Sequence, residues 1–198
     1  MHEYKDLENT VFMLGSFHTL MNFVDVIGTL MKGSGLNEVL QEIYGANAVL
    51  HMMSGKAISR AIRGHMLVHA ALSTLFVADM FPCNEYGSCF KIIKDASTLY
   101  DSIMSGKESV ANVATSDSMC ETSKLWLAYQ EKLQTVRKLI ATGRTSSWKL
   151  HLEAIQECLV IVAVAGYHNY LKSGYKYLQD MLQLPSDKPS VYELFQKG

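Results

Sequence analysis

The sequence predicts an all-α protein, an irregular multi-helix bundle of about eight or nine helices. Beyond Gly15, each long segment carries apolar residues at spacings of three and four, the repeat of a helix with one buried face. The three prolines stand at positions 82, 185 and 189, so long stretches contain no residue that breaks a helix. Serines and glycines stand where helices need N-terminal caps and C-terminal stops.

In the first half of the chain, the apolar run Val11 to Leu14 stops at Gly15, and Ser16 can cap the first helix. The expected helices span, in order, Ser16 to Gly33, Leu36 to Tyr44, Asn47 to Met53 and Lys56 to Phe81. The last of these is long, and Pro82 closes it. Its apolar positions are Ile58, Ile62, Leu67, Leu72, Leu75 and Phe76.

The second half continues the pattern after a polar segment. The expected helices are Ser88 to Met104, Thr122 to Thr142, Trp148 to Ala165, Asn169 to Leu184 and Pro189 to Gln196. Gly143 should interrupt the second of these, Ser147 should cap the third, and Pro185 should end the fourth. Residues 107–122 are rich in Ser, Thr, Asn and Asp, so a mobile connection is expected there within a single domain, 1–198.

Composition indicates a packed intracellular globule. Apolar residues make up 48% and charged residues 19%, and the net charge of -1 gives no overall field that would attract nucleic acid or a membrane surface. The polar start of the chain does not resemble a secretory signal, and no apolar run is long enough to span a bilayer. Four cysteines are too few for a disulfide scaffold, so buried free thiols in the cytoplasm or nucleus, without membrane contact, are expected.

Two groups of side chains are candidate sites. His65 and His69 stand four apart on one helix face, a spacing that can bind zinc, but no third ligand is indicated and two ordinary helix histidines are the simpler interpretation. Lys56, Arg60 and Arg63 lie near a helix start and could bind phosphates, although a solvated helix face explains them equally well. No nucleophile or phosphate-loop motif is visible.

Several short motifs resemble a widespread, functionally uncharacterised group of eukaryotic mobile-element-associated proteins. The motifs are Leu14-Gly15-Ser16-Phe17-His18-Thr19-Leu20-Met21, Gly33-Ser34-Gly35-Leu36, Met53-Ser54-Gly55-Lys56, Arg60-Ala61-Ile62-Arg63-Gly64-His65, Leu125-Trp126-Leu127-Ala128-Tyr129, Arg144-Thr145-Ser146-Ser147-Trp148-Lys149-Leu150-His151-Leu152, Asn169-Tyr170 and Val191-Tyr192-Glu193. They occur in the same order and cover most of residues 11–198.

Members of that group resemble transposases with a ribonuclease-H-like core and a large helical insertion. The resemblance implies that Val11 to Leu14 form one short strand and that His18, a candidate binding residue, opens the first helix. It also implies lost chemistry, since the leading part of that core is missing. The group's Arg-Ala-Glu segment is matched here by Ala141, Thr142 and Gly143, and its Asp-His pair is replaced by Gly166 and Tyr167. Metal-assisted strand transfer is therefore not expected.

The leading functional hypothesis is a non-enzymatic, transposon-derived helical domain that binds a macromolecular partner, either protein or nucleic acid. One alternative is a helical protein whose Met-rich and aromatic interior holds a small apolar ligand or cofactor. Another is a fragment of a metal-dependent nuclease or transposase, completed by another chain. Trp148 should be buried, with a surface binding anchor as its alternative role. The sequence names no cofactor, and a homo-oligomer stays open.

Overall fold

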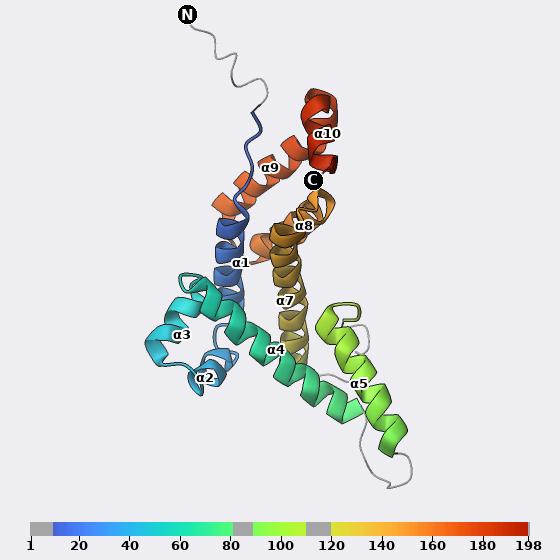
Figure 1. Cartoon of the computed structure of the whole chain (residues 1–198). Coiled ribbons are helices and arrows are strands. Elements are labelled where there is room, and N and C mark those ends of the chain that lie inside the picture. Colours follow the sequence, from blue (N-terminus) through green and yellow to red (C-terminus); the bar gives the residue numbers. More distant parts are fainter. Residues whose placement is uncertain (1–9, 81–88, 110–119, 198) are drawn as a thin grey trace, which may run out of the picture. The chain divides into compact units, whose positions relative to one another are not determined.

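A computed structural model describes residues 10–80, 89–109 and 120–197 (Figure 1). Within these ranges the chain forms nine helices and no strand, which confirms the all-α prediction. The helices are α1 (Ser16–Leu30), α2 (Leu36–Gln41), α3 (Ala46–Met53), α4 (Ile58–Met80), α5 (Cys89–Ser105), α7 (Glu121–Thr145), α8 (Trp148–Val164), α9 (His168–Asp187) and α10 (Pro189–Lys197). Val11 to Leu14, implied to be a strand, lie in an irregular segment that precedes α1.

The helices fall into two compact units. Unit 1 comprises residues 1–30 and 135–198, and unit 2 comprises residues 31–134, so that α7 begins in unit 2 and ends in unit 1. Most of the connection expected at 107–122 falls outside the described residues, which omit 110–119. Pro82, the expected stop of the helix Lys56 to Phe81, also lies outside them. The described flanks of that connection are Gly106 to Ser109, which follow α5, and Cys120, which precedes α7.

Two expected helix stops are wrong. Helix α7 continues through Gly143 to Thr145, because glycine lowers helix propensity without blocking a backbone hydrogen bond. The chain turns instead at Ser146, which has a φ of 51°. Helix α9 likewise includes Pro185. This proline stands in the last turn, so few helical hydrogen bonds follow the one that its missing N–H cannot form.

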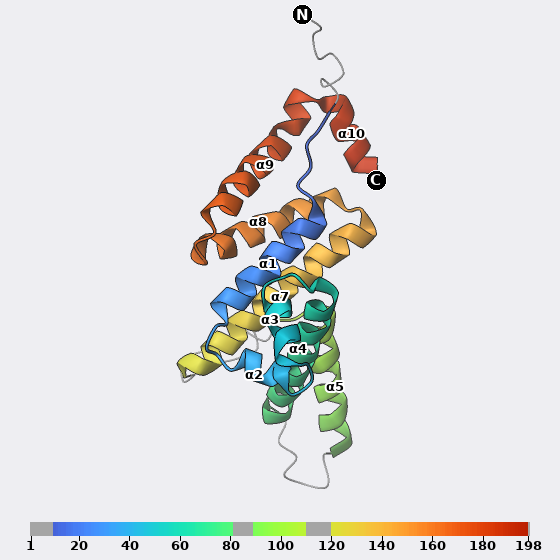
Figure 2. The same cartoon turned by 90° about the vertical axis from the view of Figure 1, so that its left-hand side faces the viewer.

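In unit 1, α8 packs against both α1 and α9, and α10 packs against α9. Figure 2 shows α8 and α9 joined at a turn, where Gly166 adopts a φ of 79° that favours glycine. The side chains of Phe23, Ile27 and Ile155 are buried in this unit. The Tyr167 hydroxyl donates a hydrogen bond to Asp25 at 3.0 Å and ties the turn to α1.

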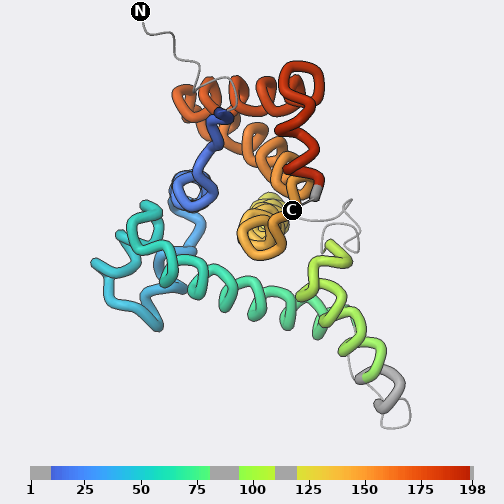
Figure 3. The backbone as a smooth tube through the Cα atoms, turned by 45° about the horizontal axis from the view of Figure 1, so that its top comes forward, coloured from blue at the N-terminus to red at the C-terminus, as the bar shows by residue number. Residues whose placement is uncertain are grey.

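In unit 2, α4 is the organising helix. Helices α2 and α3 pack against its N-terminal part, and α5 packs against its other end (Figure 3). The contact with α5 includes the buried side chains of Val77 and Ile103. The contact with α2 and α3 is close at Gly64, where an added Cβ would lie 2.6 Å from Met52 Cε. The first part of α7 contacts α4 through the buried side chains described next.

Candidate binding surfaces

Helix α4 carries two opposite rows of side chains. Residues four apart form a row along a helix, and two rows offset by two residues lie about 200° apart around the axis. The buried row consists of Ala61, His65, His69, Ser73 and Val77, and each of these residues is buried. The exposed row consists of Arg63, Leu67, Ala71, Leu75 and Asp79, and each of these residues is exposed.

The buried row is polar in its middle and hydrogen-bonds to α7. His65 Nδ1 lies 2.8 Å from the Tyr129 hydroxyl oxygen, and His69 Nδ1 lies 3.1 Å from Gln130 Oε1. The Ser73 hydroxyl also donates to Gln130 Oε1, at 3.4 Å. These bonds compensate for the loss of water around buried polar groups, so this face of α4 belongs to the folded interior.

Burial shifts the protonation of this cluster. Desolvation lowers the pKa of His65 to about 4, because the imidazolium cation has lost its water. The same effect raises the pKa of Tyr129. Near neutral pH both side chains are therefore uncharged, and either one can be the donor in their hydrogen bond, depending on the imidazole tautomer.

The exposed row is apolar in its middle. Leu67 is 47% exposed and Leu75 is 67% exposed, whereas their spacing in the sequence favoured a buried role. By length and composition alone, α4 is also the one helix in the described part of the chain that could cross a membrane. Helix α4 thus exposes Leu67 and Leu75 while it buries His65 and His69 together with other apolar residues, among them Val68 and Val77.

The structure gives no support for metal binding by His65 and His69. Both Nδ1 atoms contact α7, and within the described ranges no three His, Cys, Asp or Glu side chains gather closely enough to hold a metal ion. His65 Nε2 is buried and has no hydrogen-bond partner there. The two histidines are thus accounted for by the packing of α4 against α7.

The basic candidates Lys56, Arg60 and Arg63 are all exposed. Arg60 and Arg63 stand in the first two turns of α4, and Lys56 lies in the preceding turn. Arg63 also begins the exposed row, so the structure brings one of the three basic residues together with the apolar surface that the sequence analysis missed.

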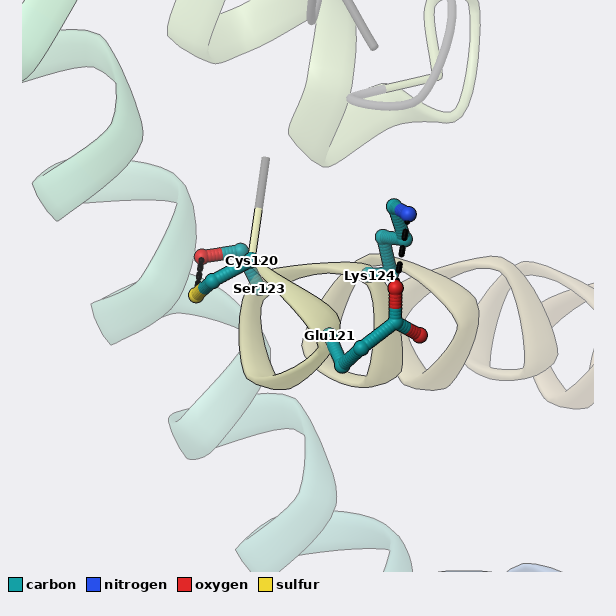
Figure 4. Close-up of polar contacts among 4 residues, drawn as sticks. All are labelled: Cys120, Glu121, Ser123 and Lys124. Atoms are coloured by element: carbon teal, nitrogen blue, oxygen red, sulfur yellow. Dashed lines mark hydrogen bonds and ion pairs between the residues drawn. The ribbon is translucent and has the colours of Figure 1, made fainter. Parts of the chain in front are cut away.

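The expectation of buried free cysteines is correct for Cys158 and wrong for Cys120. Cys120 is exposed just before α7, with its Sγ 3.2 Å from Ser123 Oγ (Figure 4). The Ser123 hydroxyl lowers the pKa of the Cys120 thiol by hydrogen bonding to it. The Glu121 carboxylate pairs instead with Lys124 at 2.8 Å, so the neighbouring acid is not positioned as a base.

Unit 1 contains a mostly apolar pocket of about 170 Å³. Its lining comes from the start of α1, the middle of α8 and the start of α9, and comprises Leu14, His18, Thr19, Asn22, Phe23, Ile155, Cys158, Leu159, Val162, Tyr170, Ser173 and Gly174. His18, a candidate from the sequence, is exposed at this pocket. Pockets for drug-sized ligands occupy roughly 300–1,000 Å³, so this one suits only a small molecule.

Trp148, the remaining candidate, is 8% exposed, which confirms that its ring is buried. It stacks on Phe195 of α10 at a centroid distance of 4.5 Å and on His151 at 5.9 Å. These two stacking partners come from α10 and from the helix of Trp148 itself, α8.

The sequence predicted the exposed row of α4 only in part. Its residues recur every four positions, but the same helix contains other apolar positions, and periodicity assigns apolar residues to the interior. The histidines and Ser73 were needed to orient the helix, and their partners Tyr129 and Gln130 lie more than 50 residues away.

Comparison with known proteins assigns the chain to a family but indicates no activity. No curated protein and no solved structure matches the chain. One family, described as Domain of unknown function (DUF8702), matches residues 1–198. The chain, with its buried His65–Tyr129 contact and its exposed row on α4, therefore belongs to the DUF8702 family over its whole length.

Proposed function

We propose that this chain is a non-enzymatic, transposon-derived helical domain that binds a protein partner through the exposed row of α4. The observation that carries the proposal is the exposure of Leu67 and Leu75 on the face of α4 opposite the buried His65 and His69. The resemblance of the motifs around His18, Arg63 and Trp148 to mobile-element proteins supports the proposed origin.

A protein partner fits this surface better than nucleic acid does. Binding to nucleic acid relies on clustered cations that neutralise phosphates, and the middle of the exposed row is formed by Leu67, Ala71 and Leu75. The chain also carries a net charge of -1. Exposed leucines between flanking charges resemble the apolar centre and polar rim of a protein interface.

A photo-crosslinking experiment tests this function. The photoreactive residue benzoylphenylalanine replaces Leu67 in one variant and Leu50, which is also exposed but lies on α3, in the control. After irradiation in extracts of the natural source, protein adducts should form at Leu67 and not at Leu50. Adducts to nucleic acid would favour the other class of partner, and equal or absent adducts at both positions would contradict the proposal.

The pocket of unit 1 supports a second candidate function, binding of a small apolar ligand. Its volume of about 170 Å³ is close to that of an apolar cavity of roughly 150 Å³ that holds benzene. His18, Asn22 and Ser173 could orient a single polar group at its wall.

Benzene and toluene are suitable probes for the pocket. Native mass spectrometry of the purified chain and thermal shift with each probe should show binding, and Ser173→Leu should abolish it by filling the pocket. Ser186→Leu, at an exposed position of α9 outside the pocket lining, is the matched control. Equal thermal shifts in both variants would show that the pocket is not the site.

A further inference from the structure

We propose that the partner of α4 is α4 of a second copy of this chain, packed antiparallel about a two-fold axis at Ala71. This inference rests on the function proposed above and names its partner. The observation that carries it is the exposed row itself, Arg63, Leu67, Ala71, Leu75 and Asp79, which is complementary to its own reverse.

In an antiparallel pair with the axis at Ala71, residues equally far from Ala71 face each other. Leu67 of one copy then faces Leu75 of the other, and Arg63 faces Asp79. Because a two-fold interface repeats every contact, the row supplies two leucine pairs and two ion pairs. A row that did not match its reverse would set like charges or a charge and a leucine against each other.

The small side chain at the centre permits close approach. Rows of residues four apart form the ridges of the commonest class of helix packing, in which the axes lie about 8–10 Å apart. Ala71 stands at the crossing point, flanked by Ala70 and Thr74. The larger leucines lie to either side, where they exclude water from the contact.

The charges of α4 are complementary in an antiparallel pair but unfavourable in a single helix. Helix α4 has no acidic residue in its first turn and no basic residue in its last turn, where each would be favourable. Asp79 instead lies in the last turn, which already has negative character. Within the described ranges neither Arg63 nor Asp79 takes part in an ion pair.

A membrane is a poorer occupant for this surface. The row from Arg63 to Asp79 spans about 24 Å, which is shorter than the ~30 Å hydrocarbon core and carries a charge at each end. Insertion would also remove His65 and His69 from their hydrogen-bond partners on α7.

Charge reversal gives the sharpest test, measured as the dissociation constant by analytical ultracentrifugation of the full chain. Arg63→Asp and Asp79→Arg should each weaken self-association at least tenfold, since each sets like charges opposite one another. The double variant should recover to within about threefold of the natural chain. Both substitutions follow the helix dipole, so loss of the dimer cannot be attributed to unfolding.

Two further variants locate the contact. Leu75→Asp should abolish the dimer, whereas Leu50→Asp, at a leucine with the same 67% exposure on α3, should leave it intact. In a background with Cys83, Cys89 and Cys120 changed to serine, Ala71→Cys should form an intermolecular disulfide across the axis. Ala46→Cys, exposed at the start of α3, should not. Circular dichroism confirms that each variant folds.

The outcomes separate this inference from the proposed function. A monomer at every concentration that still gives adducts with another protein at Leu67 overturns the second copy and leaves partner binding intact. A monomer without adducts overturns both. A dimer that is insensitive to Leu75→Asp and to both charge reversals joins through another surface, and this also overturns the inference.

Discussion

The Nδ1 atom of His65 lies 2.8 Å from the hydroxyl oxygen of Tyr129, and both side chains are almost fully buried. This contact joins α4 to α7 across 64 residues of sequence. It fixes which face of α4 points into unit 2, and so it also determines that Leu67 and Leu75 stay exposed.

The first prediction concerns that contact. Tyr129→Phe removes one partner and leaves the His65 ring buried with an unpaired Nδ1, so it should lower the free energy of unfolding by about 1–3 kcal/mol. Urea denaturation measures the change. Tyr175→Phe, at a tyrosine that is 63% exposed, is the control and should change stability little. Equal effects would mean that the hydrogen bond contributes nothing.

The second prediction is a loss of stability in mild acid. The pKa of His65 in the folded chain, about 4, lies below the ordinary histidine value of 6.5, so the unfolded chain binds the proton more readily between these values. The stabilisation that depends on neutral His65 is complete above about pH 6.5. The free energy of unfolding should fall by about 3 kcal/mol by pH 4, because the unfolded chain takes up the proton first. His65→Gln should flatten this part of the pH profile, measured by urea denaturation. An unchanged slope in the variant would assign it to other groups.

The third prediction compares two helical glycines. Gly64→Ala should destabilise by about 1–3 kcal/mol, because the new Cβ would lie 2.6 Å from Met52 Cε and 3.0 Å from Leu40 Cδ2. Gly143→Ala, with open space around it in α7, should stabilise by about 0.5–1 kcal/mol through helix propensity. Thermal unfolding of both variants checks the opposite changes in stability. A rise in the unfolding temperature of Gly64→Ala would show that α2 and α3 can shift at little cost to make room for the new Cβ.

The fourth prediction concerns the aromatic stack of unit 1. Trp148→Ala should lower the free energy of unfolding by roughly 3–5 kcal/mol, the usual effect of truncating a buried aromatic residue. Tyr175→Ala, at an exposed position of α9, should have a small effect in the same denaturant series. A change near zero for Trp148→Ala, combined with lost partner binding, would make this residue a binding anchor instead.

The fifth prediction is the absence of strand cleavage. We expect no nuclease or strand-transfer activity with magnesium or manganese, because Ala141, Gly143, Gly166 and Tyr167 are uncharged at positions where the proposed transposon origin implies charged groups. Incubation with labelled DNA tests this. Metal-dependent cleavage that disappears when one carboxylate is changed to alanine would contradict it.

Local signals predicted most of the helices and several of their ends. Ser147 caps α8 and accepts a hydrogen bond from the Leu150 amide, as its position before an apolar run indicated. Glycine and proline inside helices were harder to read, since Gly143 and Pro185 stand within α7 and α9 rather than at their ends. Their cost depends on the turn in which they stand and on the packing around it.

The sequence by itself determined the all-α class, the approximate order of the helices and the burial of Trp148. These properties follow from spacing, caps and residue size within short segments. Only the tertiary structure decided that α4 buries His65 and His69 and exposes Leu67 and Leu75. Periodicity reports how apolar residues repeat, but partners distant in sequence select the face that is buried. Here these partners are Tyr129 and Gln130, whose hydrogen bonds offset the free-energy cost of burying His65 and His69.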